Sequence, residues 1–79
     1  MAAMDKVKKD ILDFFAQSKA QVGHVFNAKA FQFSVMNHYN PKEMAAVEDS
    51  MNALVVDGLV EERQRQYHLT QKGFDHIYA

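Results

Sequence analysis

The side chains best suited to binding a ligand lie in one short polar segment near the C-terminal end of the chain. Guanidinium and ammonium groups bind phosphate oxygens, and the amides between them can donate hydrogen bonds. Glu61 and Glu62 precede the segment and dilute its positive charge. The segment predicts phosphate contacts; the alternative is a turn that is polar only because it is exposed. Its basic and amide members are Arg63, Gln64, Arg65, Gln66 and Lys72.

The sequence lacks the residue spacings of the common catalytic, metal-binding and phosphate-binding motifs. The histidines lack the His-x-x-x-His spacing of a helical metal site, and the chain has no cysteine. Its three glycines do not form a phosphate-binding loop, and no serine stands in a nucleophile motif. We therefore expect a protein that is not an enzyme and that uses no metal and no cofactor. The histidines are His24, His38, His68 and His76.

Size and composition predict one small globular domain, which we place at residues 5–79. The chain has 79 residues, of which 48% are hydrophobic and 24% charged, with a net charge of −1. That charge gives no general attraction to nucleic acid, so any binding requires a local basic patch. The sequence contains no apolar run of the roughly 18–20 residues that span a membrane, and its N-terminus lacks the apolar core of a signal peptide. We expect a cytoplasmic protein.

The element that organises the other predictions is a helix over residues 41–57. Asn40 is a suitable N-cap, Pro41 suits the first helical position, and Glu43 stands where its carboxylate can return to the cap. Gly58 can adopt the left-handed conformation that ends a helix. One apolar stripe is predicted to face the core, formed by Met44, Val47, Met51, Leu54 and Val55.

The remaining elements follow from caps and periodicity. Asp5 predicts the start of a first helix that ends near residue 16 or 18. Asn27 predicts a second helix from residue 28 to about 37, although the alternating apolar side chains of residues 31–35 would also fit a strand. A short strand at 22–26, a hairpin linked by residues 64–66 and a last helix capped by Thr70 complete the prediction.

This order resembles the winged helix-turn-helix domain of small prokaryotic transcription regulators. The strings Gly58-Leu59-Val60-Glu61 and Tyr67-x-Leu69-Thr70-x-Lys72-Gly73 are similar to the two ends of the wing in that superfamily. The resemblance implies an α+β fold with a three-helix core, a small β-hairpin wing and a short C-terminal helix. It also implies that the third helix enters the major groove of duplex DNA and that the wing touches the backbone.

The resemblance assigns DNA-binding roles to two groups of residues. Lys42 and Asn52 are the donors that could reach base edges from the outer face of the third helix, where Asp49 would repel phosphates. The wing and the residue that follows it would hold phosphates. These wing candidates are Arg63, Gln64, Arg65 and Lys72.

The alternative function is a winged-helix module that binds protein instead of DNA. A seam of small residues on the outer face of the third helix repeats at steps of four and three, which suits a neighbouring helix. Further apolar residues remain after the core has been filled. This surface predicts a homodimer or a protein partner. Its members are Leu12, Phe33, Met36, Ala46, Asp49, Ala53 and Val56, and Lys42 continues the seam.

Overall fold

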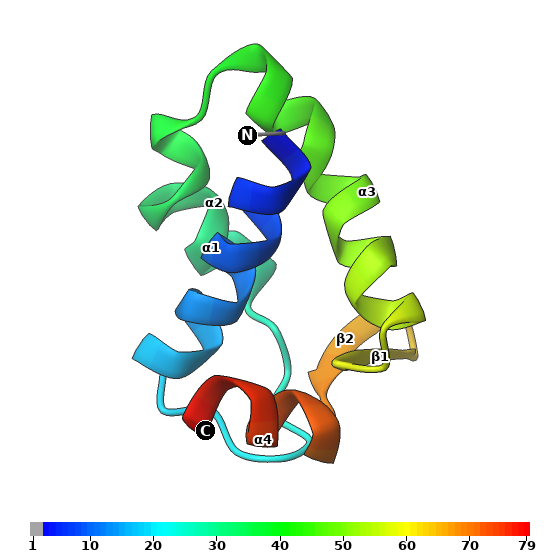
Figure 1. Cartoon of the computed structure of the whole chain (residues 1–79). Helices are drawn as coiled ribbons and strands as arrows, with labels where there is room; N and C mark the ends of the chain where they lie inside the picture. The colour runs from blue at the N-terminus through cyan, green and yellow to red at the C-terminus, as the bar shows by residue number, and fades with distance from the viewer. Residues whose placement is uncertain (1–2) are drawn as a thin grey trace.

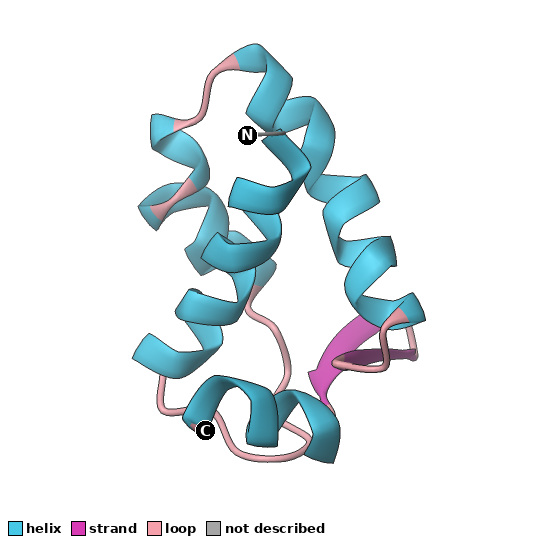
Figure 2. Ribbon diagram, in the orientation of Figure 1, coloured by secondary structure: helices cyan, strands magenta, loops and turns pink. Residues whose placement is uncertain are grey.

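A computed structural model describes residues 3–79 and shows an α+β architecture (Figures 1 and 2). Within these residues the chain forms four α-helices and one antiparallel hairpin of two strands. The order of the elements is α1 (Ala3–Gln17), α2 (Ala28–Ser34), the 3-10 turn η1 (Met36–His38), α3 (Pro41–Val56), β1 (Val60–Arg63), β2 (Gln66–Leu69) and α4 (Gln71–Tyr78).

Helix α3 begins and ends where the sequence predicts. The side chain of Asn40 accepts a hydrogen bond from the Glu43 N–H at 2.8 Å, and the Glu43 carboxylate accepts one from the Asn40 N–H at 3.0 Å. This reciprocal pair satisfies two N–H groups that the first helical turn leaves without partners. At the other end Gly58 has a φ of +79°, which confirms its role in ending the helix.

The core lies mainly between α1 and α3. Val7, Ile11 and Phe15 are buried on one face of α1, and α3 contributes Met51 and Leu54. The prediction of the apolar stripe on α3 was wrong for its first residue, Met44. Met44 is 42% exposed, because the first turn of α3 lies beside η1, outside the buried core.

Ser50 is the one polar side chain in the core of the described residues. It is fully buried, and its hydroxyl donates a hydrogen bond to the Met4 carbonyl oxygen at 3.2 Å. A small hydroxyl that finds a backbone acceptor can be buried at little cost and lets α1 and α3 approach closely.

The first two helices differ from their predicted boundaries. Helix α1 begins at Ala3, so Asp5 lies in its first turn and does not cap it; residues 1 and 2 lie outside the described residues. The α2 cap is confirmed, because Asn27 accepts a hydrogen bond from the Ala30 N–H at 3.0 Å. The helix ends at Ser34, however, since Val35 has a φ of −117° and the chain tightens into η1.

The predicted strand at 22–26 is reduced to a single bridge between Val25 and His68. The segment still follows the edge of β2, because the Gly23 N–H donates to the Leu69 carbonyl at 2.7 Å and the Phe26 N–H donates to the Tyr67 carbonyl at 2.7 Å. Gly23 has a φ of +87°, which interrupts the extended backbone and prevents a regular third strand.

The hairpin and α4 are joined by Thr70. Its side chain caps α4 by accepting a hydrogen bond from the Gly73 N–H at 3.0 Å, as the sequence predicts. The same hydroxyl lies 2.6 Å from the Gly58 carbonyl oxygen and 2.9 Å from that of Leu59, so its proton is shared between them. One side chain thus connects the end of α3, the start of β1 and the first turn of α4.

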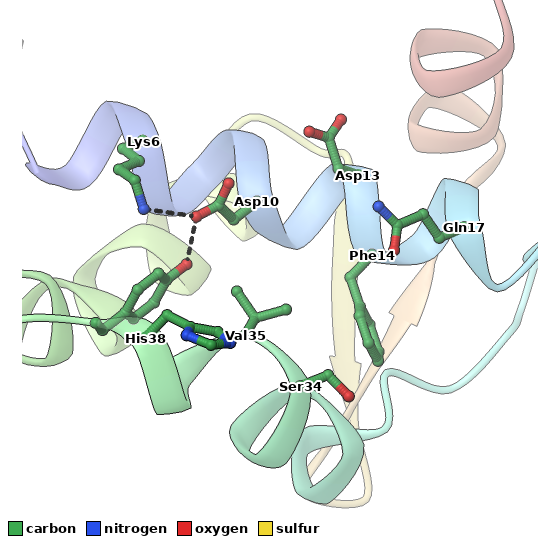
Figure 3. A pocket seen from close by; sticks show the side chains of 9 residues that line it. Lys6, Asp10, Asp13, Phe14, Gln17, Ser34, Val35 and His38 are labelled. Carbon is green, nitrogen blue, oxygen red and sulfur yellow. Dashed lines mark hydrogen bonds and ion pairs between the residues drawn. The ribbon is translucent and has the colours of Figure 1, made fainter.

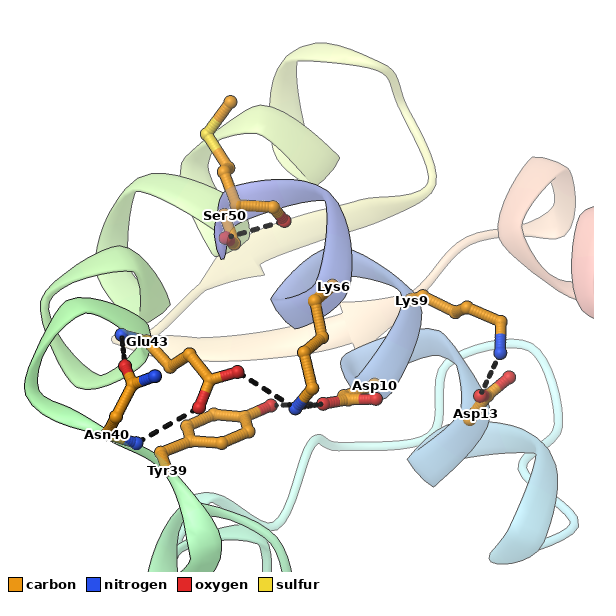
Figure 4. A network of polar contacts seen from close by, with 9 residues as sticks. Lys6, Lys9, Asp10, Asp13, Tyr39, Asn40, Glu43 and Ser50 are labelled. Atoms are coloured by element: carbon orange, nitrogen blue, oxygen red, sulfur yellow. Dashed lines mark hydrogen bonds and ion pairs between the residues drawn. The ribbon is translucent and has the colours of Figure 1, made fainter. Parts of the chain in front are cut away.

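A polar network holds the start of α3 against α1 (Figure 4). Lys6 lies between two carboxylates, 3.2 Å from Asp10 and 3.1 Å from Glu43, and the Tyr39 hydroxyl donates to Asp10 at 2.7 Å. The hydrogen bond from the Asn40 N–H and the contact with Lys6 lower the pKa of Glu43 below its ordinary value. Burial and the bond to Asp10 raise the pKa of Tyr39.

Replacing Gly73 by alanine is expected to destabilise the fold by about 3 kcal/mol or more, because overpacking against rigid backbone is costly. A Cβ there would clash with the Leu59 carbonyl oxygen and lie 2.8 Å from Leu69 Cδ1. Urea unfolding of Gly73→Ala measures the loss. The control His76→Ala changes an exposed side chain of the same helix and should alter the free energy of unfolding by less than about 0.5 kcal/mol. Equal stabilities of the two variants would show that the backbone around Leu59 can move to make room for the added Cβ.

The Glu43 carboxylate should make stability depend on pH. The pKa of Glu43 is lower in the folded chain than its ordinary value of 4.5. The stabilisation of the fold by the ionised carboxylate is therefore complete above pH 4.5 and is lost as the pH falls through the folded pKa. Glu43→Gln should therefore be less stable than wild type at pH 7, and the difference should shrink towards pH 3. Urea unfolding of both proteins at several pH values measures it. A difference that stays constant with pH would contradict this assignment.

Candidate nucleic-acid interface

The hairpin turn has a conformation that its residues do not favour. The strand register pairs Arg63 with Gln66, which leaves two turn residues, where the sequence predicted a link of three. Gln64 has a φ of +53° and Arg65 a φ of +64°, as in the type I′ turn that asparagine and glycine favour. A left-handed backbone costs a residue with an ordinary side chain about 1 kcal/mol or more.

Arg63 and Arg65 are both exposed at the turn, but they differ in how free each charge is to bind a ligand. Arg63 is exposed, but its Nε lies 2.8 Å from a Glu61 carboxylate oxygen on the same strand. Arg65 is also exposed and forms no salt bridge with any residue of 3–79. Exposed ion pairs are weak and exchange readily, so Arg63 can leave Glu61 for a phosphate.

Lys72 does not belong to this cluster, which corrects the sequence prediction. The antiparallel register places Leu69 opposite Val60, at the end of the hairpin away from the turn, and Lys72 follows that end. Its ammonium group donates to the Asp57 carbonyl oxygen at 2.8 Å. Lys72 therefore binds the C-terminus of α3, where the helix dipole favours a cation.

The two residues of α3 that were predicted to contact base edges lie far apart on its outer face. Lys42 and Asn52 are both exposed, but ten residues separate them, which corresponds to about 15 Å along a helix. Glu48 and Asp49 are exposed between them. The pKa of Tyr67 on β2 is raised by its burial and by two carboxylates, one of them that of Glu48. The Glu48 carboxylate therefore lies close enough to the hairpin to act on Tyr67.

The predicted partner surface is only partly exposed. Leu12, Met36 and Ala46 pack against the core, so they are not surplus apolar residues. Leu12 lies off the main stripe of α1 but is still half-buried against the core. Four members of the predicted surface reach solvent to differing degrees: Phe33 at 69%, Val56 at 86%, Asp49 exposed and Ala53 half-buried.

A groove at the junction of α2, η1 and α3 was not predicted. It has a volume of about 340 Å³ and is lined by the apolar side chains of Phe33, Met36 and Met44, with Gln32 and Asn37 beside them. Helical spacing assigned Met44 to the core stripe, since residues 44, 47, 51 and 54 repeat correctly. Only the course of the chain before Pro41 shows that the first turn of α3 extends beyond the core.

A second cavity of about 210 Å³ lies between α1 and α2 (Figure 3). Asp10 in its wall already accepts hydrogen bonds from Lys6 and Tyr39. Within residues 3–79, Ser34 and His38 form no hydrogen bond with each other, so they do not make a nucleophile and base pair.

Residues 3–79 hold no cluster of three histidine or acidic side chains that could bind a metal ion. Among the same residues, each helix is too short or too polar to cross a bilayer. The chain matches no protein-family model, no curated protein and no solved structure.

Replacing the two left-handed turn residues by residue types that favour this conformation should stabilise the protein. Gln64→Asn with Arg65→Gly supplies the residues that a type I′ turn favours, and we expect the free energy of unfolding to rise by about 1 kcal/mol. Arg63→Gly with Gln66→Asn makes the same exchanges at extended strand positions, where both new residues are unfavourable, and should destabilise the hairpin. Thermal unfolding of both variants tests this. A less stable Gln64→Asn/Arg65→Gly protein would mean that the turn is not strained.

Proposed function

We propose that residues 5–79 form a winged-helix domain that binds duplex DNA, with the hairpin as the wing and Arg63 and Arg65 on the phosphates. The order of elements supports this proposal, since a hairpin follows directly on a long third helix and returns to a short final one. A transcription-regulator-like role without a cofactor is the corresponding biological function.

The observation that carries the proposal is the pair of left-handed residues in the turn. Gln64 and Arg65 occupy positions that asparagine and glycine would fill without strain. Strained backbone concentrates where side chains serve a function. An arginine held at the outermost point of a hairpin, with no carboxylate partner within residues 3–79, is suited to contact a phosphate.

The charge distribution limits the proposed contact to the turn. Glu48 and Asp49 on the outer face of α3 would repel the phosphates that border a groove. Lys42 and Asn52 remain the base-edge candidates, but their separation prevents them from acting on one base pair. The proposed binding is accordingly dominated by phosphate contacts, with little discrimination between sequences and a strong dependence on salt.

A second function, contact with another protein, is favoured by Phe33. A phenylalanine that is 69% exposed beside an apolar groove is unusual for a surface that meets only water or DNA. This function does not exclude the first, because the residues that line the groove differ from those of the hairpin turn.

Removing the two arginines tests the DNA-binding proposal. Binding to random-sequence duplex DNA, followed by fluorescence anisotropy at several salt concentrations, should weaken in Arg63→Ala/Arg65→Ala. The slope of log affinity against log salt should fall by about two, since two phosphate contacts are lost. Equal slopes for wild type and this variant, or no binding by wild type, would overturn the proposal.

Two further double variants complete this experiment. Lys9→Ala/Lys19→Ala removes the same charge from exposed positions on or just after α1, so it should leave the slope nearly unchanged. Lys42→Ala/Asn52→Ala removes the base-edge candidates of α3, and it should lower affinity far less than the loss of both arginines. A larger effect of the α3 variant would move the contact from the hairpin to the helix.

A further inference from the structure

The groove between α2 and α3 has apolar side chains in its walls, and residues of opposite charge lie one helical turn beyond them, one on each helix. Phe33 on α2 and Met44 on α3 are its most exposed apolar residues. One helical turn from Phe33 on the same face of α2 lies Lys29, and one turn beyond Met44 on α3 lies Glu48. Both charged residues are exposed, and neither forms a salt bridge with any residue of 3–79.

We propose that this groove is the contact surface of a homodimer, in which Phe33 of each protomer packs on Met44 of the other and Lys29 pairs with Glu48 across a two-fold axis. The inference is independent of DNA binding. It commits to a second copy of this chain because one surface carries both halves of a complementary charge pair, as an isologous interface requires.

The arrangement of the two helices supports this pairing. Helices α2 and α3 lead away from the segment that joins them (Figure 1), and both helices contribute residues to the groove. A two-fold axis that lies in the contact plane between the helices places α3 of the partner over α2. The partner's Met44 then lies over Phe33, near the joining segment, and the partner's Glu48 lies over Lys29, one turn farther away.

The composition of the groove fits a small and reversible interface. A phenylalanine and two methionines form its centre, and these residue types are enriched in the contact regions of complexes. Amide side chains of Gln32 and Asn37 border them and can remain solvated at the rim. Because the groove is modest in size, we expect a dimer that forms at high micromolar concentration.

Sedimentation equilibrium of the whole chain tests the apolar centre. Wild type should dimerise, and Phe33→Asp should weaken association at least about thirtyfold, as expected when an aromatic anchor is lost. The matched control is Val56→Asp, which places the same charge at an apolar residue that is 86% exposed and outside the groove. Circular dichroism should show both variants folded, since both side chains are largely exposed.

A charge-reversal experiment tests the pairing across the axis. Lys29→Glu alone brings two pairs of carboxylates together in the dimer, and Glu48→Lys alone brings two pairs of ammonium groups together, so each variant should be mainly monomeric. An equimolar mixture of the two restores both opposite-charge pairs and should form a heterodimer. A charge pair within one chain could not produce this rescue by mixing.

Three outcomes would overturn the inference. Wild type that stays monomeric at high micromolar concentration would leave the groove to a different protein. Dimerisation that survives Phe33→Asp but is lost in Val56→Asp would place the interface at the end of α3. A mixture of Lys29→Glu and Glu48→Lys that remains monomeric would reject the two-fold charge pairing. None of these results depends on whether the protein binds DNA.

Discussion

The contact between α1 and α3 is the constraint on which the rest of the structure depends. A domain of 79 residues has room for few core layers, and here the buried face of α1 supplies three residues of the main one, Val7, Ile11 and Phe15. Ser50 lets α3 approach α1 because its buried hydroxyl finds the Met4 carbonyl. Near the start of α3 the Lys6 network fixes the same pair of helices through charges.

Once α3 is placed, the positions of the hairpin and of α4 follow. Gly58 ends the helix and turns the chain into β1, while the Thr70 hydroxyl returns to the carbonyls of Gly58 and Leu59. Gly73 permits α4 to approach the Leu59 carbonyl more closely than any side chain would allow. The hairpin is therefore anchored at its base and along the edge of β2, and its turn, with the two proposed phosphate ligands, is exposed to solvent.

The two proposed surfaces consist of different residues and use different physics. At the hairpin the proposed interaction is electrostatic, so salt should weaken it and the sequence of the DNA should matter little. At the groove the centre is apolar and the charges at its sides select orientation. A dimer of this kind would carry two hairpins, and the effective concentration of the second hairpin would strengthen the proposed binding to one duplex if their spacing allows both to reach it.

The sequence by itself determined the local features of this protein. Caps and turn glycines have short-range signatures, which is why the boundaries of α3, the Asn27 and Thr70 caps and the existence of the hairpin were predicted correctly. The exposure of Phe33 was also predicted, because an aromatic residue opposite the buried face of a short helix has no partner along the chain.

Only the tertiary structure decided which residues from different elements meet. Helical spacing cannot show that Met44 lies beside η1, that Leu12 is covered, or that Lys72 binds the end of α3 instead of joining the arginines. The same holds for the hairpin, where the register shortened the link to two residues and forced Gln64 and Arg65 into left-handed conformations. Periodicity describes one element at a time, whereas these contacts arise from the packing of several.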